Sequence, residues 1–141
     1  MTMKRNEFIK TLGMGTLAAC AGCSLLSCGT NEPEPKVNIT LDLSSTQNAA
    51  LANVGGSLIR DGIIIVQYET DKFVAFNRAC THQGTPINYQ STEKKFKCPN
   101  HGSEFDLLTG NALTGPATVA LRSYTTELSM VDGKKQLKIT N

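Results

Sequence analysis

Two short motifs bring together cysteine and histidine, which are scarce in this chain. The first is Cys80-Thr81-His82 and the second is Cys98-Pro99-Asn100-His101, with fifteen residues between them. Together they hold both histidines of the chain and two of its five cysteines. Thiolate and imidazole are ligands that suit zinc, copper and iron. Because each motif offers one of each, two loops can bring four such ligands to one metal centre.

A ligand set of this kind admits two metal chemistries. Two cysteines and two histidines commonly hold a tetrahedral structural zinc. The same set serves a Rieske [2Fe-2S] cluster, in which two cysteines bind one iron and two histidines bind the other. A disulfide between Cys80 and Cys98 is a third interpretation for an oxidising compartment, but it leaves both histidines unexplained.

The residues around the motifs resemble the Rieske family over roughly residues 57–140. The chain reads Cys80-Thr81-His82-Gln83-Gly84 and then Cys98-Pro99-Asn100-His101-Gly102-Ser103. Further on, Gly115-Pro116-Ala117 is similar to the third, proline-containing loop of that family. The pair of motifs is highly specific, so the resemblance favours the iron–sulfur cluster over zinc.

The resemblance implies a ligand set and a chemistry. Cys80 and Cys98 would hold a buried iron, while His82 and His101 would hold an outer iron with their rings at the surface. Each chain would carry one [2Fe-2S] cluster and transfer one electron at a time. Because both histidines are then used, no 2-His-1-carboxylate iron site remains, and the chain alone is not expected to be an oxygenase.

The resemblance also indicates which side chains tune the cluster. In the quinol-oxidising members of cytochrome bc complexes, a serine after His-Gly bonds a bridging sulfide and a tyrosine two places later bonds a cysteine sulfur. Ser103 matches the serine, whereas Phe105 stands at the tyrosine position, and the loop disulfide of those proteins falls at Thr85 and Asn100. We therefore expect a potential below the cytochrome bc type and above the Rieske ferredoxins of ring-hydroxylating systems. The expected tuning residues are Ser103, Phe105, Gly102, Gly84 and Pro116.

The elements that must position these motifs are predicted to be short antiparallel strands. Apolar and polar residues alternate over 37–43, which is typical of a strand with one buried face. Only residues 47–54 are expected to be helical, ending at Gly55-Gly56. The predicted fold is all-β, with Rieske-like stacked antiparallel sheets. The expected hairpins pair residues 63–68 with 72–77 and residues 121–131 with 136–139.

A loop-rich segment lies between those hairpins. Over residues 79–120 the strand periodicity fades and Gly, Pro, Asn and Thr accumulate, as in the functional loops of a rigid β-scaffold. The expected organisation is a signal or anchor at 1–28, a linker at 29–36 and a Rieske domain at 37–141. Its cluster-binding part covers about 79–120.

The first residues have the layout of an export signal. Residues 1–10 are polar and basic, and residues 11–27 are weakly apolar and uncharged,. Residues 5–10 resemble a twin-arginine signal, except that Asn6 replaces the second arginine. This layout predicts a place in the cell envelope, anchored to a membrane and facing the periplasm or the exterior.

Two cysteines in that segment are candidates for lipidation. Residues 17–20 and 25–28 each resemble a bacterial lipobox, so either Cys20 or Cys28 would carry the lipid. The alternative is an uncleaved anchor helix over residues 12–28, which at about 1.5 Å per residue barely spans the hydrocarbon layer. Either alternative tethers the domain through the proline-containing linker 29–36.

The composition of the chain reduces the number of function classes that fit it. The chain has 14 Lys and Arg residues against 12 Asp and Glu, which leaves no basic stripe for nucleic acid. The expected function is that of an envelope electron carrier whose partners are redox proteins, with a membrane cytochrome or a quinol among the candidates. The alternative is an iron–sulfur subunit of a larger quinol- or arsenite-oxidising complex, so whether the chain is part of an enzyme stays open. A ferredoxin for a dioxygenase and a zinc-stabilised binding module are the remaining hypotheses.

Overall fold

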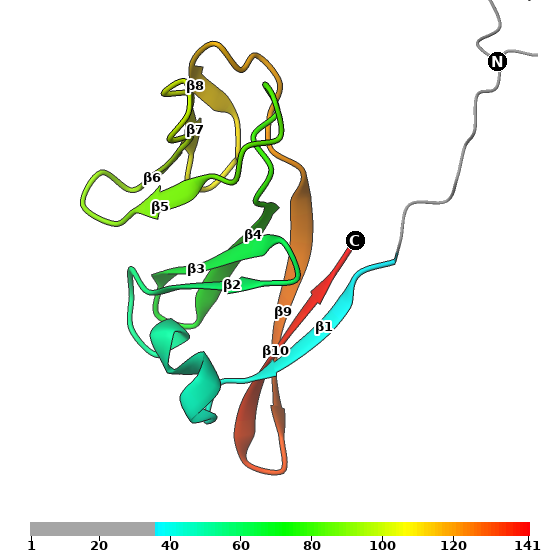
Figure 1. Ribbon diagram of the computed structural model, residues 1–141. Helices are drawn as coiled ribbons and strands as arrows, with labels where there is room; N and C mark the ends of the chain where they lie inside the picture. Colours follow the sequence, from blue (N-terminus) through cyan, green and yellow to red (C-terminus); the bar gives the residue numbers. More distant parts are fainter. Residues whose placement is uncertain (1–35) are drawn as a thin grey trace, which may run out of the picture. The chain divides into compact units, whose positions relative to one another are not determined.

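The computed structural model describes residues 36–141, which form two antiparallel sheets (Figure 1). The larger sheet has the strand order β1-β10-β9-β4-β3-β2 and the smaller sheet the order β5-β6-β7-β8. The predicted all-β fold of antiparallel sheets is therefore confirmed. The strands of the larger sheet are β1 (Asn38–Asp42), β2 (Ser57–Arg60), β3 (Ile63–Glu69), β4 (Lys72–Asn77), β9 (Ser123–Val131) and β10 (Lys134–Thr140). Those of the smaller sheet are β5 (Asn88–Gln90), β6 (Lys95–Lys97), β7 (Glu104–Asp106) and β8 (Ala112–Thr114).

Asp-Gly pairs make the β2–β3 and β9–β10 turns of the larger sheet. Asp61 and Gly62 join β2 to β3 with φ values of 50° and 76°, and Asp132 and Gly133 join β9 to β10 with 50° and 74°. Positive φ at both central residues is the requirement of a type I′ hairpin turn. The two predicted hairpins, β3 with β4 and β9 with β10, are both present.

Strand β3 lies between two apolar cores. Ile64 and Val66 belong to a core that reaches into the smaller sheet, while Ile63 and Ile65 belong to a core shared with β1 and β10. Burial of both faces explains why this segment is an unbroken apolar run rather than an alternating one. The first core also contains Cys80 and Cys98.

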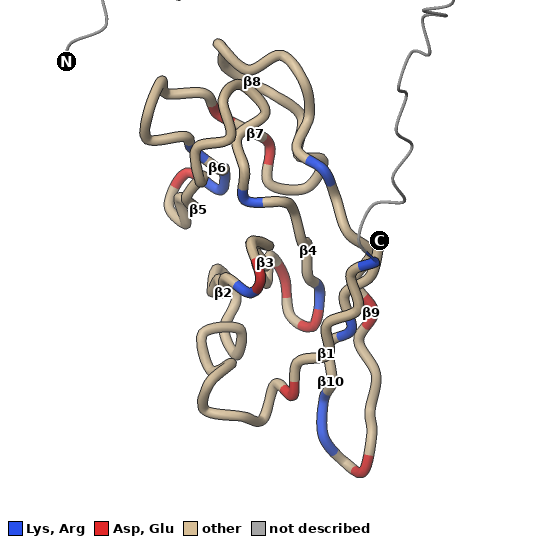
Figure 2. The backbone as a smooth tube through the Cα atoms, turned by 45° about the vertical axis from the view of Figure 1, so that its right-hand side comes forward, with Lys and Arg blue, Asp and Glu red and all other residues tan. Residues whose placement is uncertain are grey.

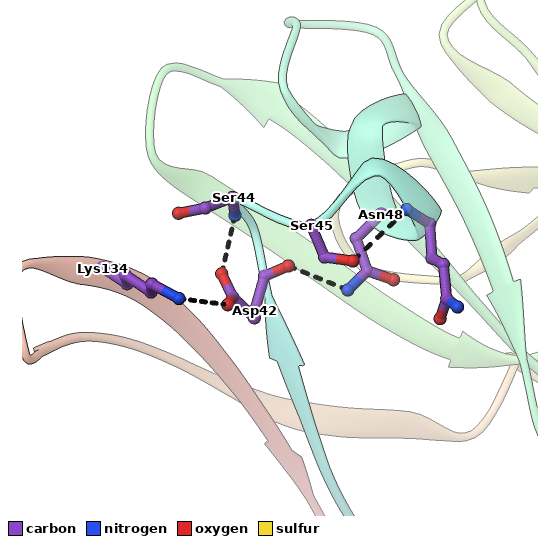
Figure 3. Close-up of polar contacts among 6 residues, drawn as sticks. Asp42, Ser44, Ser45, Asn48 and Lys134 are labelled. Atoms are coloured by element: carbon purple, nitrogen blue, oxygen red, sulfur yellow. Dashed lines mark hydrogen bonds and ion pairs between the residues drawn. The ribbon is translucent and has the colours of Figure 1, made fainter.

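The predicted helical segment is a short 3-10 helix, η1 (Thr46–Leu51). Asp42 organises the path into it: its carboxylate accepts from the Ser44 backbone N–H at 2.8 Å, and its carbonyl oxygen accepts from the Asn48 side chain at 2.9 Å (Figure 3). The Ser45 hydroxyl accepts from the backbone N–H two residues on, and Lys134 pairs with Asp42 at 3.7 Å. Side-chain caps of this kind satisfy backbone groups at a helix start.

Four short strands lie within the segment that the sequence predicts to be loop-rich. Each of its strands has three residues, which is too short for a period-two pattern to stand out. Within residues 36–141 no helix is long and apolar enough to cross a membrane. The predicted signal or anchor, its lipidation candidates Cys20 and Cys28, and nearly all of the linker lie outside the described residues.

Gly110 joins the smaller sheet to the larger one. Its N–H donates to the Asp106 carbonyl oxygen and its own carbonyl accepts from Leu121 N–H. Its φ is 70°, and a Cβ at this position would lie 2.6 Å from Cε1 of Phe76. Glycine is therefore required here for two reasons: the backbone is left-handed, and a Cβ would clash with the ring of Phe76.

We expect Gly110→Ala to lower the free energy of unfolding more than Gly133→Ala does. Both positions have positive φ, but a Cβ at Gly133 meets nothing within 4 Å, so Gly133→Ala carries only a backbone cost of about 1 kcal/mol. The clash with Phe76 should add about 1–3 kcal/mol. Denaturant unfolding of the two variants measures the difference, and equal losses would contradict this role of Phe76.

Candidate metal centre

Two loops of matching geometry carry the cysteine and histidine motifs. The loop 80–85 follows β4, and the loop 98–103 connects β6 to β7. In each, the cysteine N–H donates to the carbonyl oxygen five residues later, from Cys80 to Thr85 at 2.9 Å and from Cys98 to Ser103 at 2.8 Å. The same backbone hydrogen bond therefore closes both loops, although the cysteine and the histidine are one residue farther apart in the second motif.

A glycine completes each of these loops. Gly84 N–H donates to the Cys80 carbonyl at 2.7 Å, and Gly102 N–H donates to the Cys98 carbonyl at 3.1 Å. Both glycines have positive φ, 73° and 75°, a conformation that glycine adopts without steric cost. Each glycine is therefore required by the left-handed backbone of its turn,.

The two cysteines form a buried pair. Both thiols lie in the core that includes Phe96 and Phe105. Burial raises the pKa of the Cys98 thiol, but the backbone N–H groups of Asn100 and His101 and the neighbouring Cys80 thiol outweigh it, so the net pKa is lowered. The thiolate is the form that binds metal, and these N–H groups already point at its sulfur.

The two histidines form an exposed pair outside the cysteines. His82 and His101 come from different loops, and their ring centroids lie 4.9 Å apart at an interplanar angle of 76°. Both residues are exposed. The structure therefore sorts the four candidate ligands into a buried thiol pair and a surface imidazole pair.

A third loop, residues 115–120, packs against the other two. The fully buried Ser103 hydroxyl accepts the N–H of Ala117, the residue after Pro116, at 3.0 Å. The Thr81 hydroxyl donates to the Val119 carbonyl oxygen at 2.7 Å. Sequence reasoning missed the contribution of Thr81, because its partner is a backbone group 38 residues away and leaves no sequence signal.

Phe105 and the Thr85–Asn100 pair occupy the positions singled out by family resemblance. Phe105, on β7, is fully buried in the core beside both cysteines and directly opposite Phe96. Asn100 Nδ2 lies 3.5 Å from Thr85 Oγ1. A side-chain contact therefore joins the first loop to the second at these two positions.

Charged groups near the second loop neutralise one another. Glu104 follows Ser103 on β7 and accepts from Lys95 at 2.9 Å, with Lys97 at 3.5 Å. The hydrogen bond from Lys95 is the main reason that the pKa of Glu104 is lowered. The carboxylate is therefore charged at neutral pH and compensated by lysines on the adjacent strand.

The donor set fits a two-iron cluster held from both sides. Across the two loops, the Cys80 and Cys98 thiols contact each other, and the His82 and His101 rings contact each other. Such pairing matches a cluster with two cysteines on one iron and two histidines on the other. Among residues 36–141, no three His, Cys, Asp or Glu side chains are grouped tightly enough for a single metal ion.

The chain is similar to known iron–sulfur proteins. Residues 40–125 match the family model of the Rieske [2Fe-2S] domain. The cytochrome b6-f complex iron-sulfur subunit 1 of Nostoc sp. (strain PCC 7120 / SAG 25.82 / UTEX 2576) is 33% identical over 87 residues, covering 57% of this chain and 48% of that protein. The corresponding subunit of Nostoc punctiforme (strain ATCC 29133 / PCC 73102) is 39% identical over 67 residues, covering 48% and 37%. The chain thus spans about half or less of the length of these curated relatives.

Solved structures agree with the fold. The cyanobacterial plasma membrane Rieske protein PetC3 from Synechocystis PCC 6803 superimposes with a TM-score of 0.52 at 25% identity, covering 74% of this chain and 98% of that one. The Sphingomonas yanoikuyae B1 ferredoxin gives a TM-score of 0.51 at 18% identity, covering 74% and 99%. The second likeness concerns the fold alone.

We expect a disulfide to form in the double variant Thr85→Cys/Asn100→Cys, because these side chains already touch. Closing a loop of about 15 residues should raise the free energy of unfolding by about 3 kcal/mol. Intact mass, which falls by two hydrogens, and denaturant unfolding with and without reductant measure the effect. The single variants are the controls, and a double variant with two free thiols under oxidising conditions would contradict the contact.

Proposed function

Because this chain belongs to the Rieske [2Fe-2S] domain family, we propose that it carries single electrons in the cell envelope through a cluster held by Cys80, Cys98, His82 and His101. When bound, such a cluster supplies one-electron transfer. This reaction needs no side chain that donates a proton or acts as a nucleophile. The sorting of the four candidate ligands into a buried thiol pair and an exposed imidazole pair carries this proposal.

The buried side of the site stabilises negative charge on cysteine sulfur. The backbones of Cys80 and Cys98 are anchored by the bonds that close their loops, and their side chains are buried in the core. The N–H groups of Asn100 and His101 favour the Cys98 thiolate. Backbone donors to ligand sulfur stabilise the more negative state of an iron–sulfur centre and so raise its potential.

The exposed side provides the contact for electron exchange. The rings of His82 and His101 reach the surface next to each other, whereas the cysteines are shielded by the core. A partner that approaches these rings is therefore nearer to the ligands than a partner on any other face. This geometry suits electron transfer between proteins.

The N-terminal segment and the relatives support the proposed position and partners of the domain. The signal-like residues 1–28 support an anchored domain facing the periplasm or exterior, with Cys20 or Cys28 lipidated. The relatives named above are subunits of the cytochrome b6-f complex and a plasma membrane Rieske protein, which supports a membrane cytochrome or a quinol as partner. Membership of a larger quinol- or arsenite-oxidising complex is the second candidate function, favoured by the same b6-f relatives.

An EPR-monitored potentiometric titration of the purified full-length chain tests the proposal. A reduced sample should give a rhombic signal with a low mean g value, and its midpoint should fall inside the family range of roughly −150 to +300 mV. A colourless, EPR-silent chain that contains one zinc and no sulfide would overturn it. Purification with a cytochrome b or a molybdenum subunit would favour the larger complex.

We expect Ser103→Ala to lower the midpoint potential. The Ser103 oxygen accepts from Ala117 N–H, which leaves its own hydrogen free to be donated to sulfur. Loss of a donor that prefers the reduced state by about 0.5–1.5 kcal/mol corresponds to about 20–65 mV. Ser129→Ala, on the exposed far end of β9, is the control, and a potential that is equal in both variants would remove Ser103 from the tuning set.

We expect Phe105→Tyr to raise the midpoint potential by a similar amount, because it adds a hydroxyl beside the cysteines. Phe96→Tyr is a matched control, since Phe96 is equally buried and pairs with Phe105 across β6 and β7. Redox titration of both variants gives the comparison. An equal shift in the two variants would mean that general core polarity, and not a bond to sulfur, sets the potential.

A further inference from the structure

Strand β1 is an open edge of the larger sheet. Within residues 36–141 it pairs with β10 on one side and with no strand on the other (Figure 1). The N–H of Leu43, just beyond β1, donates to the Lys135 carbonyl oxygen at 2.9 Å. Because facing residues of antiparallel strands alternate between hydrogen-bonded and non-hydrogen-bonded pairs, every second residue of β1 directs its backbone groups away from β10. The N–H and C=O groups of Asn38, Thr40 and Asp42 therefore point to the open edge.

The backbone groups on this edge are available to a partner. Within residues 36–141, no hydrogen bond to the backbone of Asn38 or Thr40 is present on this edge, and both residues are exposed. The Asp42 carbonyl oxygen already accepts from Ser45 N–H at 3.1 Å and from the Asn48 amide at 2.9 Å, so at this end only the N–H remains. β1 contains no proline, lysine or bulge, the features that commonly keep an edge strand from pairing.

The residues of β1 are complementary to themselves when two copies of the strand run antiparallel about Thr40. In this register Asn38 lies opposite Asp42 of the second copy, and Ile39 lies opposite its Leu41. An amide that donates then faces a carboxylate that accepts, and apolar residues face apolar residues on the other side of the sheet. The same register satisfies the backbone, since Thr40 N–H meets the second copy's Thr40 carbonyl and Asp42 N–H meets its Asn38 carbonyl.

Charge and apolar packing favour the antiparallel arrangement. Lys36 precedes β1 and Asp42 ends it, so the charges of this stretch lie at its two ends (Figure 2). Two antiparallel copies bring Lys36 of each near Asp42 of the other, whereas parallel copies would place like charges together. Val37 and Leu43 are only partly buried against the core shared by β1 and β10. Opposite each other in this register, they would lose further exposed apolar area.

We propose that β1 pairs with β1 of a second copy of this chain, antiparallel about Thr40, so that two larger sheets become one continuous sheet. The interface is isologous, because the same strand serves on both sides of a two-fold axis. The inference is independent of the proposed function, since the loops that carry the cluster ligands follow β4 and join β6 to β7.

The size of this contact sets its expected strength. β1 has five residues, which is a small contact compared with a standard protein–protein interface. We therefore expect a reversible dimer, with a dissociation constant between about 1 μM and 1 mM.

Sedimentation equilibrium of the full-length chain in non-ionic detergent measures the association. The fraction of dimer should rise with the concentration of the chain. Asn38→Asp places carboxylates opposite each other at both ends of the paired strands, and like charges directly opposite destabilise a sheet. The dissociation constant of this variant should rise about tenfold or more.

A double variant restores the complementarity. Asn38→Asp/Asp42→Asn exchanges the two groups, so an amide again faces a carboxylate. Its dissociation constant should return to within about threefold of the original value. The amide oxygen introduced at position 42 can still accept from Ser44 N–H, as the carboxylate does, so the path into η1 is kept.

Thr40→Cys locates the two-fold axis. In the dimer the two introduced thiols face each other on strands whose Cα atoms are about 5.5 Å apart, which suits a disulfide. Oxidised glutathione, which accepts the two electrons, should link this variant into a covalent dimer about tenfold faster than Thr125→Cys. Thr125 is the matched control, because it is an exposed threonine on the same face of the sheet but lies on β9, two strands from the edge. The unmodified chain gives the background from the cysteines that it already contains.

Hydrogen exchange identifies any other occupant of the edge. Thr40 N–H should be protected only at concentrations at which the dimer forms. Protection that is independent of concentration would assign the edge to residues 1–35 of the same chain and overturn the proposal. A chain that stays monomeric at about 1 mM, equal cross-linking of the two cysteine variants, or failure of the double variant to restore the dimer would overturn it as well. The EPR signal of the cluster should be the same in every variant, which shows that a lost dimer does not result from a lost fold.

Discussion

The structure of the site depends on one pattern of backbone hydrogen bonds, which closes each of the two cysteine loops. The N–H of Cys80 and that of Cys98 each donate to the carbonyl five residues later, and a glycine with positive φ completes each turn. This closure turns each cysteine side chain inward, to the core of the domain, and leaves each histidine on the outer side of the same loop. Because the closures match, C-x-H and C-x-x-H each place a cysteine in the core and a histidine at the surface, although the two motifs differ in spacing.

The rest of the fold holds the two closures against each other. Strand β3, buried on both faces, joins the core of the larger sheet to the core that contains the cysteines. Gly110 lets the β7–β8 turn approach Phe76, and the third loop is bonded to the first two through Thr81 and Ser103. These two bonds therefore hold the third loop against the loops that carry the cysteine and histidine pairs.

Much of this could be predicted from the sequence, for identifiable reasons. The hairpins can be predicted because apolar runs and turn residues such as Asp132-Gly133 are local signals. The candidate ligands can be predicted because cysteine and histidine are rare in this chain and occur together in two short motifs. Strands β5–β8 were missed because three residues carry no periodicity. The bond from Thr81 to Val119 was missed because its acceptor is a backbone carbonyl far away in sequence. Tertiary contacts of this kind have no local signature.

The central claim is that both imidazoles and both thiols bind one two-iron cluster. The chain contains only two histidines, so incorporation of 15N-histidine labels His82 and His101 and no other residue. Pulsed EPR of the reduced, labelled full-length chain is the most direct measurement. The account predicts two nitrogen couplings that change with the isotope, one from each ring. Couplings that do not respond to the label, or a single responsive nitrogen, would contradict it.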